Sequence, residues 1–145
     1  MANLSITGAR APSTGFDLGR LILRLVVGVL ILLHGISKIS GGAGFILDVV
    51  SKAGLPGPFG YLVYVGELVA PILLIVGLWT RAAALVVVID MAFAVALVHL
   101  GEFFTLNQTG GWSLELQAMY LFGALAVALL GAGRYSLGGL YGRWN

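Results

Sequence analysis

The chain has 145 residues, of which 59% are hydrophobic and only 10% are charged, and its mean hydropathy is +1.03. Soluble globular domains carry about 25% charged residues, so this composition excludes that class and predicts one all-α integral membrane domain. The net charge of +2 comes from few residues and does not indicate binding to nucleic acid. The chain has no cysteine, which excludes disulfide exchange by this chain alone and thiolate metal sites.

Four apolar runs are long enough to cross a hydrocarbon core of about 30 Å, which takes roughly 20 helical residues. We therefore expect an antiparallel bundle of four transmembrane helices in the lipid bilayer. The predicted spans lie near residues 19–39, 60–80, 82–100 and 114–132. Residues 1–18 and 138–145 are predicted as tails. Most arginines fall at the ends of the chain and in the 80–82 turn, and the positive-inside rule places that side in the cytoplasm.

The first outer loop has a helical pattern of its own. Apolar and polar residues alternate at helical spacing over residues 44–53, and the glycines and prolines of residues 54–58 end the pattern. This predicts a short helix that lies in the membrane interface and partly covers the outer mouth of the bundle. A mobile loop is the alternative.

Ionisable residues inside a membrane are costly and count by default as functional candidates. The predicted topology brings five of them to a similar depth near the outer membrane surface: His34, Lys38, Glu67, His99 and Glu115. Four spans with polar residues at one depth indicate a site. Ordinary interfacial or snorkelling side chains are the alternative for Lys38, His99 and Glu115.

Helical geometry sharpens this hypothesis in two of the spans. Pro71 lies one turn after Glu67 and cannot donate a backbone hydrogen bond, so we expect a kink beside that carboxylate. Asp90 and His99 are nine residues apart and point about 180° away from each other on a regular helix. Both cannot face one pocket unless the helix is distorted. We therefore predict a buried Arg24–Asp90 ion pair that clamps the bundle.

A membrane quinone suits the predicted cluster. Its carbonyl groups need hydrogen-bond donors, and its two-electron reduction takes up two protons. His34 and Lys38 are the expected donors, and Glu67 is the expected proton relay. A zinc, iron or copper ion held by the histidines and glutamates is one alternative. A haem between His34 and His99 is another, and transport of protons or small solutes is a third.

Several short motifs resemble those of the DoxX family of small four-helix bacterial membrane proteins. They are "RLVVGVLILLHGISKI", "VGELVAPILLIVGLWTRAAAL", "AVALVH", "GGWSLELQAMYL" and "GAGRYSL", and they run from about residue 19 to residue 137. Within them, the matching positions are His34, Gly35, Lys38, Glu67, Thr80, Arg81 and Glu115. The resemblance implies a membrane bundle linked to redox systems, in some relatives as a subunit of a thiosulfate:quinone oxidoreductase.

These observations lead to one leading hypothesis and one rival. The leading hypothesis is a quinone-interacting subunit of an oxidoreductase system in a bacterial inner membrane, with His99 and Glu115 completing the pocket. Its electrons would come from a partner protein or a bound cofactor. The rival is a non-catalytic scaffold or assembly factor that recruits a redox or stress-response partner. Small residues such as Gly28, Gly35 and Gly123 allow close helix contacts within or between protomers, so a homo-oligomer is compatible with either hypothesis.

Overall fold

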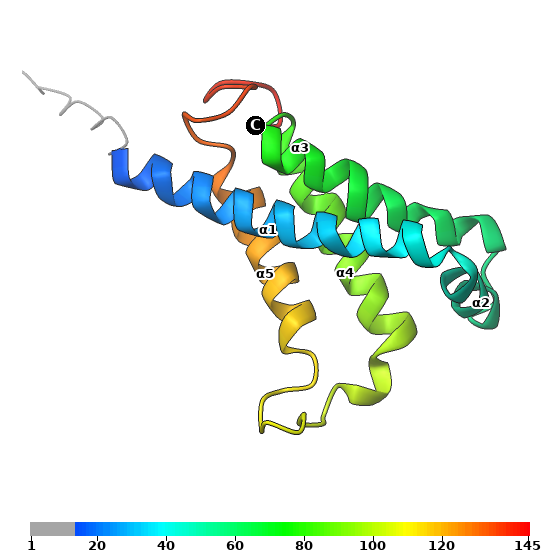
Figure 1. Cartoon of the computed structure of the whole chain (residues 1–145). Helices are drawn as coiled ribbons and strands as arrows, with labels where there is room; N and C mark the ends of the chain where they lie inside the picture. Colours follow the sequence, from blue (N-terminus) through cyan, green and yellow to red (C-terminus); the bar gives the residue numbers. More distant parts are fainter. Residues whose placement is uncertain (1–13) are drawn as a thin grey trace, which may run out of the picture.

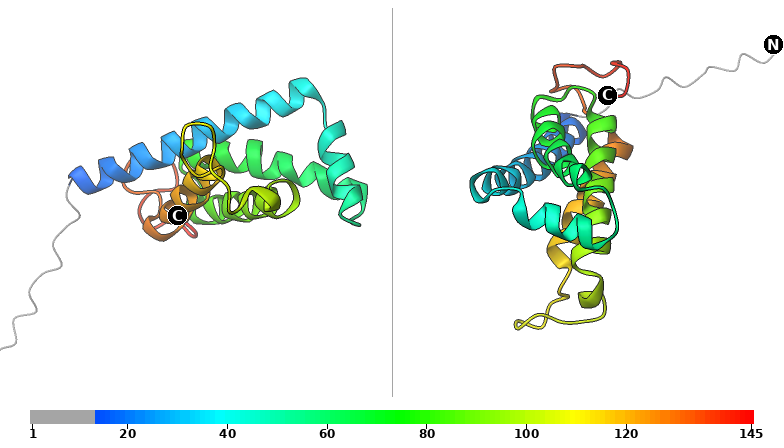
Figure 2. Two further views of the ribbon diagram at one scale, coloured as in Figure 1. Left: turned by 90° about the horizontal axis from the view of Figure 1, so that it is seen from below. Right: turned by 90° about the vertical axis from the view of Figure 1, so that its right-hand side faces the viewer.

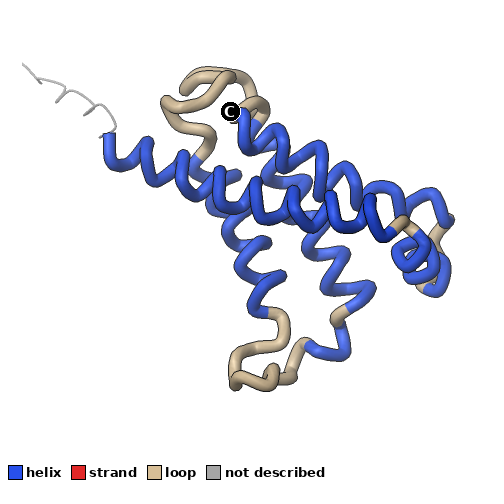
Figure 3. The backbone as a smooth tube through the Cα atoms, viewed as in Figure 1, coloured by secondary structure: helices blue, strands red, loops and turns tan. Residues whose placement is uncertain are grey.

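A computed structural model describes residues 14–145, and this part of the chain is helical with no strand. Of the tail predicted at residues 1–18, residues 1–13 lie outside the described part. The remaining residues of that predicted tail, 14–18, already belong to the first helix. Figure 3 shows helices connected by short loops, apart from one longer loop between α4 and α5.

Every predicted span coincides with helical structure. The first is α1 (Thr14–Gly41) and the second combines η1 (Gly57–Leu62), η2 (Val65–Val69) and α3 (Ala70–Val76). The third is α4 (Thr80–Val98), followed by η3 (Leu100–Glu102), and the fourth is α5 (Glu115–Leu130). The short helix expected after the first span is present as α2 (Gly44–Lys52).

Two of these segments, Gly57–Val76 and Thr80–Val98, are long and apolar enough to cross a membrane, and α5 is a shorter apolar helix. Large apolar side chains also remain exposed along the outside of the helices. Phe93, Phe122 and Leu129 are among them, all more than half exposed. Such an apolar exterior is the surface that a protein presents to lipid rather than to water.

The helices form two pairs that cross. Figures 1 and 2 show α1 and α3 side by side in one pair and α4 and α5 side by side in the other, with the pairs crossing steeply. This arrangement differs from the bundle of four near-parallel helices that we predicted. The buried core lies where the pairs meet and consists largely of small and branched residues: Val27, Ile31, Ala70, Leu74, Ala84, Val87, Ala124 and Val127.

Two arginines hold one end of the molecule together, Arg24 of α1 across the two pairs and Arg81 of α4 within the α4–α5 pair. The buried Arg24 guanidinium donates from Nη1 to the Ala132 carbonyl at 3.0 Å and from Nη2 to the Tyr135 carbonyl at 2.7 Å. Arg81 donates to the carbonyls of Ala128 and Leu129, the last turn of α5. The Ala128 and Leu129 carbonyls are among the last four of α5 and have no partner within the helix, so Arg81 satisfies groups that would otherwise be orphaned.

Residues 138–145, which we predicted as a tail, fold back over this end. The side chain of Asn145 is buried, and its Oδ1 accepts hydrogen bonds from the backbone and hydroxyl of Thr80 at 3.2 and 3.0 Å. Its Nδ2 donates to the Gly139 carbonyl at 2.8 Å. The C-terminal segment is therefore an ordered part of the fold that holds the α3–α4 turn in place.

Candidate functional site

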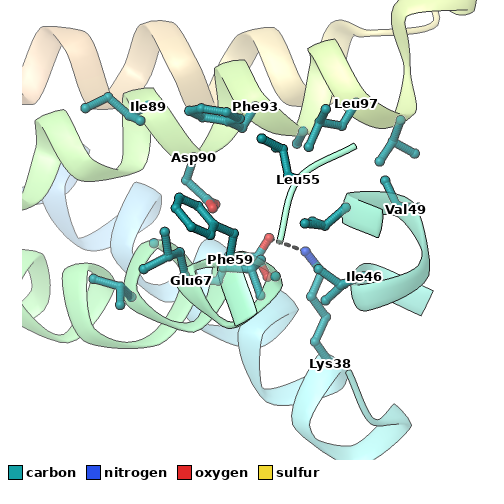
Figure 4. Close-up of a pocket in the computed structure, with 18 of the residues that line it drawn as sticks. Lys38, Ile46, Val49, Leu55, Phe59, Glu67, Ile89, Asp90, Phe93 and Leu97 are labelled. Atoms are coloured by element: carbon teal, nitrogen blue, oxygen red, sulfur yellow. Dashed lines mark hydrogen bonds and ion pairs between the residues drawn. The ribbon is translucent and has the colours of Figure 1, made fainter. Parts of the chain in front are cut away.

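The crossing of the helix pairs leaves a wedge at the other end of the molecule. There, α4 diverges from the η1–η2 part of the second span, and α2 fills the space between them only in part. The remaining cavity has a volume of about 450 Å³, within the range of small-molecule sites. Its walls are mostly apolar, and Phe59 and Phe93 lie on them in Figure 4.

An ion pair stands at the polar end of this cavity. Lys38, near the end of α1, donates from Nζ to Oε1 of Glu67 in η2. The Glu67 side chain is only 4% exposed, whereas the Lys38 side chain is 35% exposed, so the lysine reaches the carboxylate from the rim. Figure 4 shows the two groups meeting beside Ile46. The second oxygen of Glu67, Oε2, is buried and has no hydrogen-bond partner.

Backbone features of the second span position Glu67. Residues Val65–Val69 form a π-helix, in which the Ala70 amide bonds the Val65 carbonyl five residues back. The widened turn comes just before Pro71, which has no amide hydrogen to continue an ordinary α-helical ladder. The kink expected at this proline is therefore realised as a π-helical segment, and such segments occur frequently at functional sites.

Glycines bring neighbouring elements close to this segment. A methyl group added at Gly35 would clash with the Glu67 carbonyl and lie 2.7 Å from Cδ2 of Leu68, so α1 packs directly on the η2 backbone. At Gly66, an added methyl group would lie 2.7 Å from Oδ1 of Asp90. Because neither glycine has a side chain, α1 and α4 can approach the residues around Glu67 closely.

Asp90 lies in the cavity wall, and the predicted Arg24–Asp90 ion pair is wrong. The Asp90 side chain leaves α4 beside Gly66 and points into the cavity in Figure 4. Arg24 is instead held by backbone carbonyls at the opposite end of the molecule. Depth along the helices made the pair plausible, but the steep crossing of the helix pairs separates the two side chains. The buried Oδ2 of Asp90 has no hydrogen-bond partner.

His34 is not part of this site. Its Nδ1 lies 2.9 Å from the Leu30 carbonyl one turn earlier in α1, and its ring packs edge-on against Tyr120 of α5, with 5.5 Å between ring centroids. The predicted partnership of His34 with Lys38 is therefore wrong. Residues four apart share a helix face, but α1 touches η2 at Lys38 and α5 at His34.

Of the other two predicted members of the site, His99 lines the cavity and Glu115 does not. His99 lines the cavity and pairs with Oε2 of Glu102 at 3.0 Å. Asp90 and His99 both reach the cavity because α4 ends at Val98, so the regular-helix geometry that opposed them does not extend to His99. Glu115 is the exposed first residue of α5, and its Oε1 accepts from Asn107 of the α4–α5 loop at 3.2 Å. Its predicted place in the pocket is wrong.

Residues 14–145 contain no group of three or more side chains that could hold a metal ion. The structure also does not bring the two histidines together as haem ligands, since His34 faces Tyr120 while His99 faces Glu102. The cavity thus joins Lys38, Glu67, Asp90 and His99. Asp90 is the member that we assigned to a structural role. Its position as a lone acid inside the apolar run "LVVVIDMAFAV" was the signal that marked it as functional.

An apolar helical exterior and a lipophilic cavity with a buried ion pair define the class: a small helical protein of the membrane. The chain belongs to the DoxX family, whose sequence profile matches residues 19–100. It is 30% identical over 106 residues to "Putative oxidoreductase CatD" of Bacillus subtilis, covering 73% of this chain and 78% of the relative. It is 34% identical over 125 residues to an uncharacterized protein of Haemophilus influenzae, covering 79% and 84%. No solved structure matches the chain.

The motifs that resemble the family occupy two separate places in the fold. "GLWTR" and "GRYS" meet at the arginine end, where the Gly138 amide just after the second motif bonds the Gly77 carbonyl at 2.9 Å. Gly77 has a φ of +73°, and a side chain there would collide with the Arg24 guanidinium. These two motifs build the fold, whereas Lys38 and Glu67 come from the motifs that form the cavity.

Proposed function

We propose that this protein is a membrane subunit of a redox system that binds a quinone in the cavity between α2, η1, η2 and α4. One observation carries the proposal: the partly buried ion pair of Lys38 and Glu67 faces a mostly apolar cavity of about 450 Å³. A quinone has the matching chemistry, since it combines polar carbonyl groups with an apolar ring and tail. The oxidoreductase name of the Bacillus subtilis relative supports a redox role.

The apolar rim of the cavity gives such a ligand a route from the membrane. Phe59 of η1 and Phe93 of α4 line the cavity and are 53% and 55% exposed, so they also face outward. A lipophilic ligand can pass between them without crossing water. In the proposal, the topology is the predicted one, with four spans, the arginine end in the cytoplasm of a bacterial inner membrane, and the cavity toward the outer leaflet.

Each polar group has a defined task. The Lys38 ammonium has three N–H donors and uses one on Glu67, so it can donate another to a quinone carbonyl. Glu67, with Oε2 free, can accept a hydrogen bond from a hydroxyl and carry a proton. The electrons come from a redox partner protein, since the chain has no cysteine of its own to supply them as a dithiol.

Quinone retention tests the proposal. Protein is reconstituted in nanodiscs with decylubiquinone, and the quinone that remains after gel filtration is counted per protein. We expect stoichiometric retention by the natural sequence and at least a tenfold loss of affinity for Glu67→Gln, about 1.4 kcal/mol, because the amide removes the charge that holds Lys38 and the carboxylate that accepts from the ligand. Glu115→Gln is the matched control, since the structure places that glutamate outside the cavity, and it should bind like the natural sequence.

Two results would contradict the proposal. One is absence of quinone retention by the natural sequence. The other is a Glu67→Gln protein that unfolds at lower temperature while no variant changes ligand binding, and this pattern would favour the scaffold hypothesis instead.

A further inference from the structure

Asp90 has no role in the function proposed above, although it faces the same cavity. Its Oδ2 is buried without a hydrogen-bond partner, and the side chain points toward the end that holds Lys38 and Glu67 (Figure 4). A buried polar atom without a hydrogen-bond partner costs about 1–3 kcal/mol of stability. A ligand that hydrogen-bonds Asp90 would remove this cost. Gly66 makes room for this carboxyl group, since an added Cβ there would lie 2.7 Å from its Oδ1.

The charges around the cavity leave Asp90 without a counter-charge. The titratable side chains that line it are Lys38 from α1, Glu67 from η2, Asp90 from α4 and His99 just after α4, whereas the parts of α2 and η1 that line it are uncharged. Lys38 is matched by Glu67, and His99 by Glu102. The lining therefore contains one carboxyl group more than its cations balance.

A carboxyl group can meet a quinone in two ways. When protonated, it donates a hydrogen bond to a quinone carbonyl, and when ionised, it accepts one from a hydroquinone hydroxyl. We propose that Asp90 hydrogen-bonds an oxygen of the ligand ring and supplies one of the two protons of its reduction, so that Asp90 is protonated beside the quinone and ionised beside the hydroquinone. Glu67 relays the second proton, and the redox partner protein supplies the two electrons. This inference rests on the proposed quinone function and names a residue that our sequence hypothesis did not include in the site.

Proton linkage makes the inference measurable. If the quinone binds only the protonated form, its affinity falls as pH rises, by up to about tenfold per pH unit once Asp90 is ionised. If the hydroquinone binds only the ionised form, its affinity rises with pH while Asp90 is still mostly protonated and levels off once Asp90 is ionised. Asp90→Asn replaces the carboxyl group with an amide that donates and accepts at every pH, so both affinities should become independent of pH.

The experiment compares decylubiquinone with its hydroquinone, kept reduced under anaerobic conditions, in nanodiscs from about pH 5 to pH 9. Asp90→Glu should restore the pH dependence, which a purely structural role of Asp90 would not require. Asp48→Asn is the matched control, since that aspartate lies on the exposed face of α2 and pairs with Lys52. His99→Gln should also keep the natural pH dependence, which separates the carboxyl group from the histidine.

The outcomes distinguish this inference from the function on which it rests. Binding of neither form at any pH would overturn the quinone proposal itself. Binding that stays pH-dependent in a folded Asp90→Asn protein, or that is already independent of pH in the natural sequence, would overturn the role of Asp90 alone. Circular dichroism and the melting temperature of the variant establish that it is folded.

Discussion

Gly35 and Gly19 occupy the same helix but have different surroundings, and this contrast tests the contact between α1 and η2. A methyl group at Gly35 meets the Glu67 backbone, which cannot move aside, whereas a methyl group at Gly19 meets nothing within 4 Å. We expect Gly35→Ala to destabilise the protein by about 1–3 kcal/mol through overpacking. Gly19→Ala should stabilise it by about 0.5–1 kcal/mol, because alanine loses less entropy in a helix. Melting in nanodiscs measures both, and equal shifts would contradict the predicted close contact.

Residues of the site could be predicted from the sequence where a charged side chain interrupts an apolar run. Lys38 and Glu67 stand out as charges in apolar runs, and the structure brings them together. His34 looks just as exceptional in the sequence, yet it faces α5. Asp90 was visible but assigned to the wrong partner. Helical phase gives the direction of a side chain around its own helix, but the neighbour that it meets depends on how the helices cross.

A buried arginine of α1 fixes the segment that follows α5. Arg24 is 2% exposed and donates to two backbone carbonyls just beyond α5. We expect Arg24→Met to lower the free energy of unfolding by about 2–4 kcal/mol, because each buried carbonyl left without a donor costs about 1–3 kcal/mol. The melting temperature in nanodiscs measures the loss.

Arg143→Met is the control for this change, since Arg143 is exposed and the same net charge is removed. It should leave the melting temperature unchanged. Quinone retention of a folded Arg24→Met protein at low temperature should be normal, because the arginine end is separate from the cavity. A selective loss of binding without a loss of stability would contradict this division of the molecule.

The helices themselves were predictable because membrane helices follow directly from apolar length. The four predicted ranges match α1, the η1–η2–α3 segment, α4 and α5, and the interfacial pattern of residues 44–53 matches α2. The proline in the second span indicated a local distortion. Its form as a π-helix was not predictable, because this segment is packed closely between α1 at Gly35 and Asp90 of α4, which meets Gly66.

The membrane topology of the whole molecule can be tested by labelling single introduced cysteines. The natural sequence has no cysteine, so it gives no background labelling. Ser51→Cys in α2 and Thr109→Cys in the α4–α5 loop introduce thiols at exposed positions, as does Arg143→Cys near the other end. We expect a membrane-impermeant maleimide to label the first two on intact cells. The third should react only after the membrane is permeabilised. Labelling of all three on intact cells would contradict the predicted four-span orientation.

The crossing of the helix pairs makes the cavity sensitive to the membrane around it. The cavity lies in the wedge between α4 and the η1–η2 part of the second span, so its width follows the angle between the pairs. A helix whose apolar length exceeds the hydrocarbon thickness responds by tilting. We therefore expect a thicker bilayer to bring the pairs nearer to the membrane normal and narrow the wedge, and a thinner one to widen it. Lipid chain length would then regulate access to the cavity without any dedicated effector site.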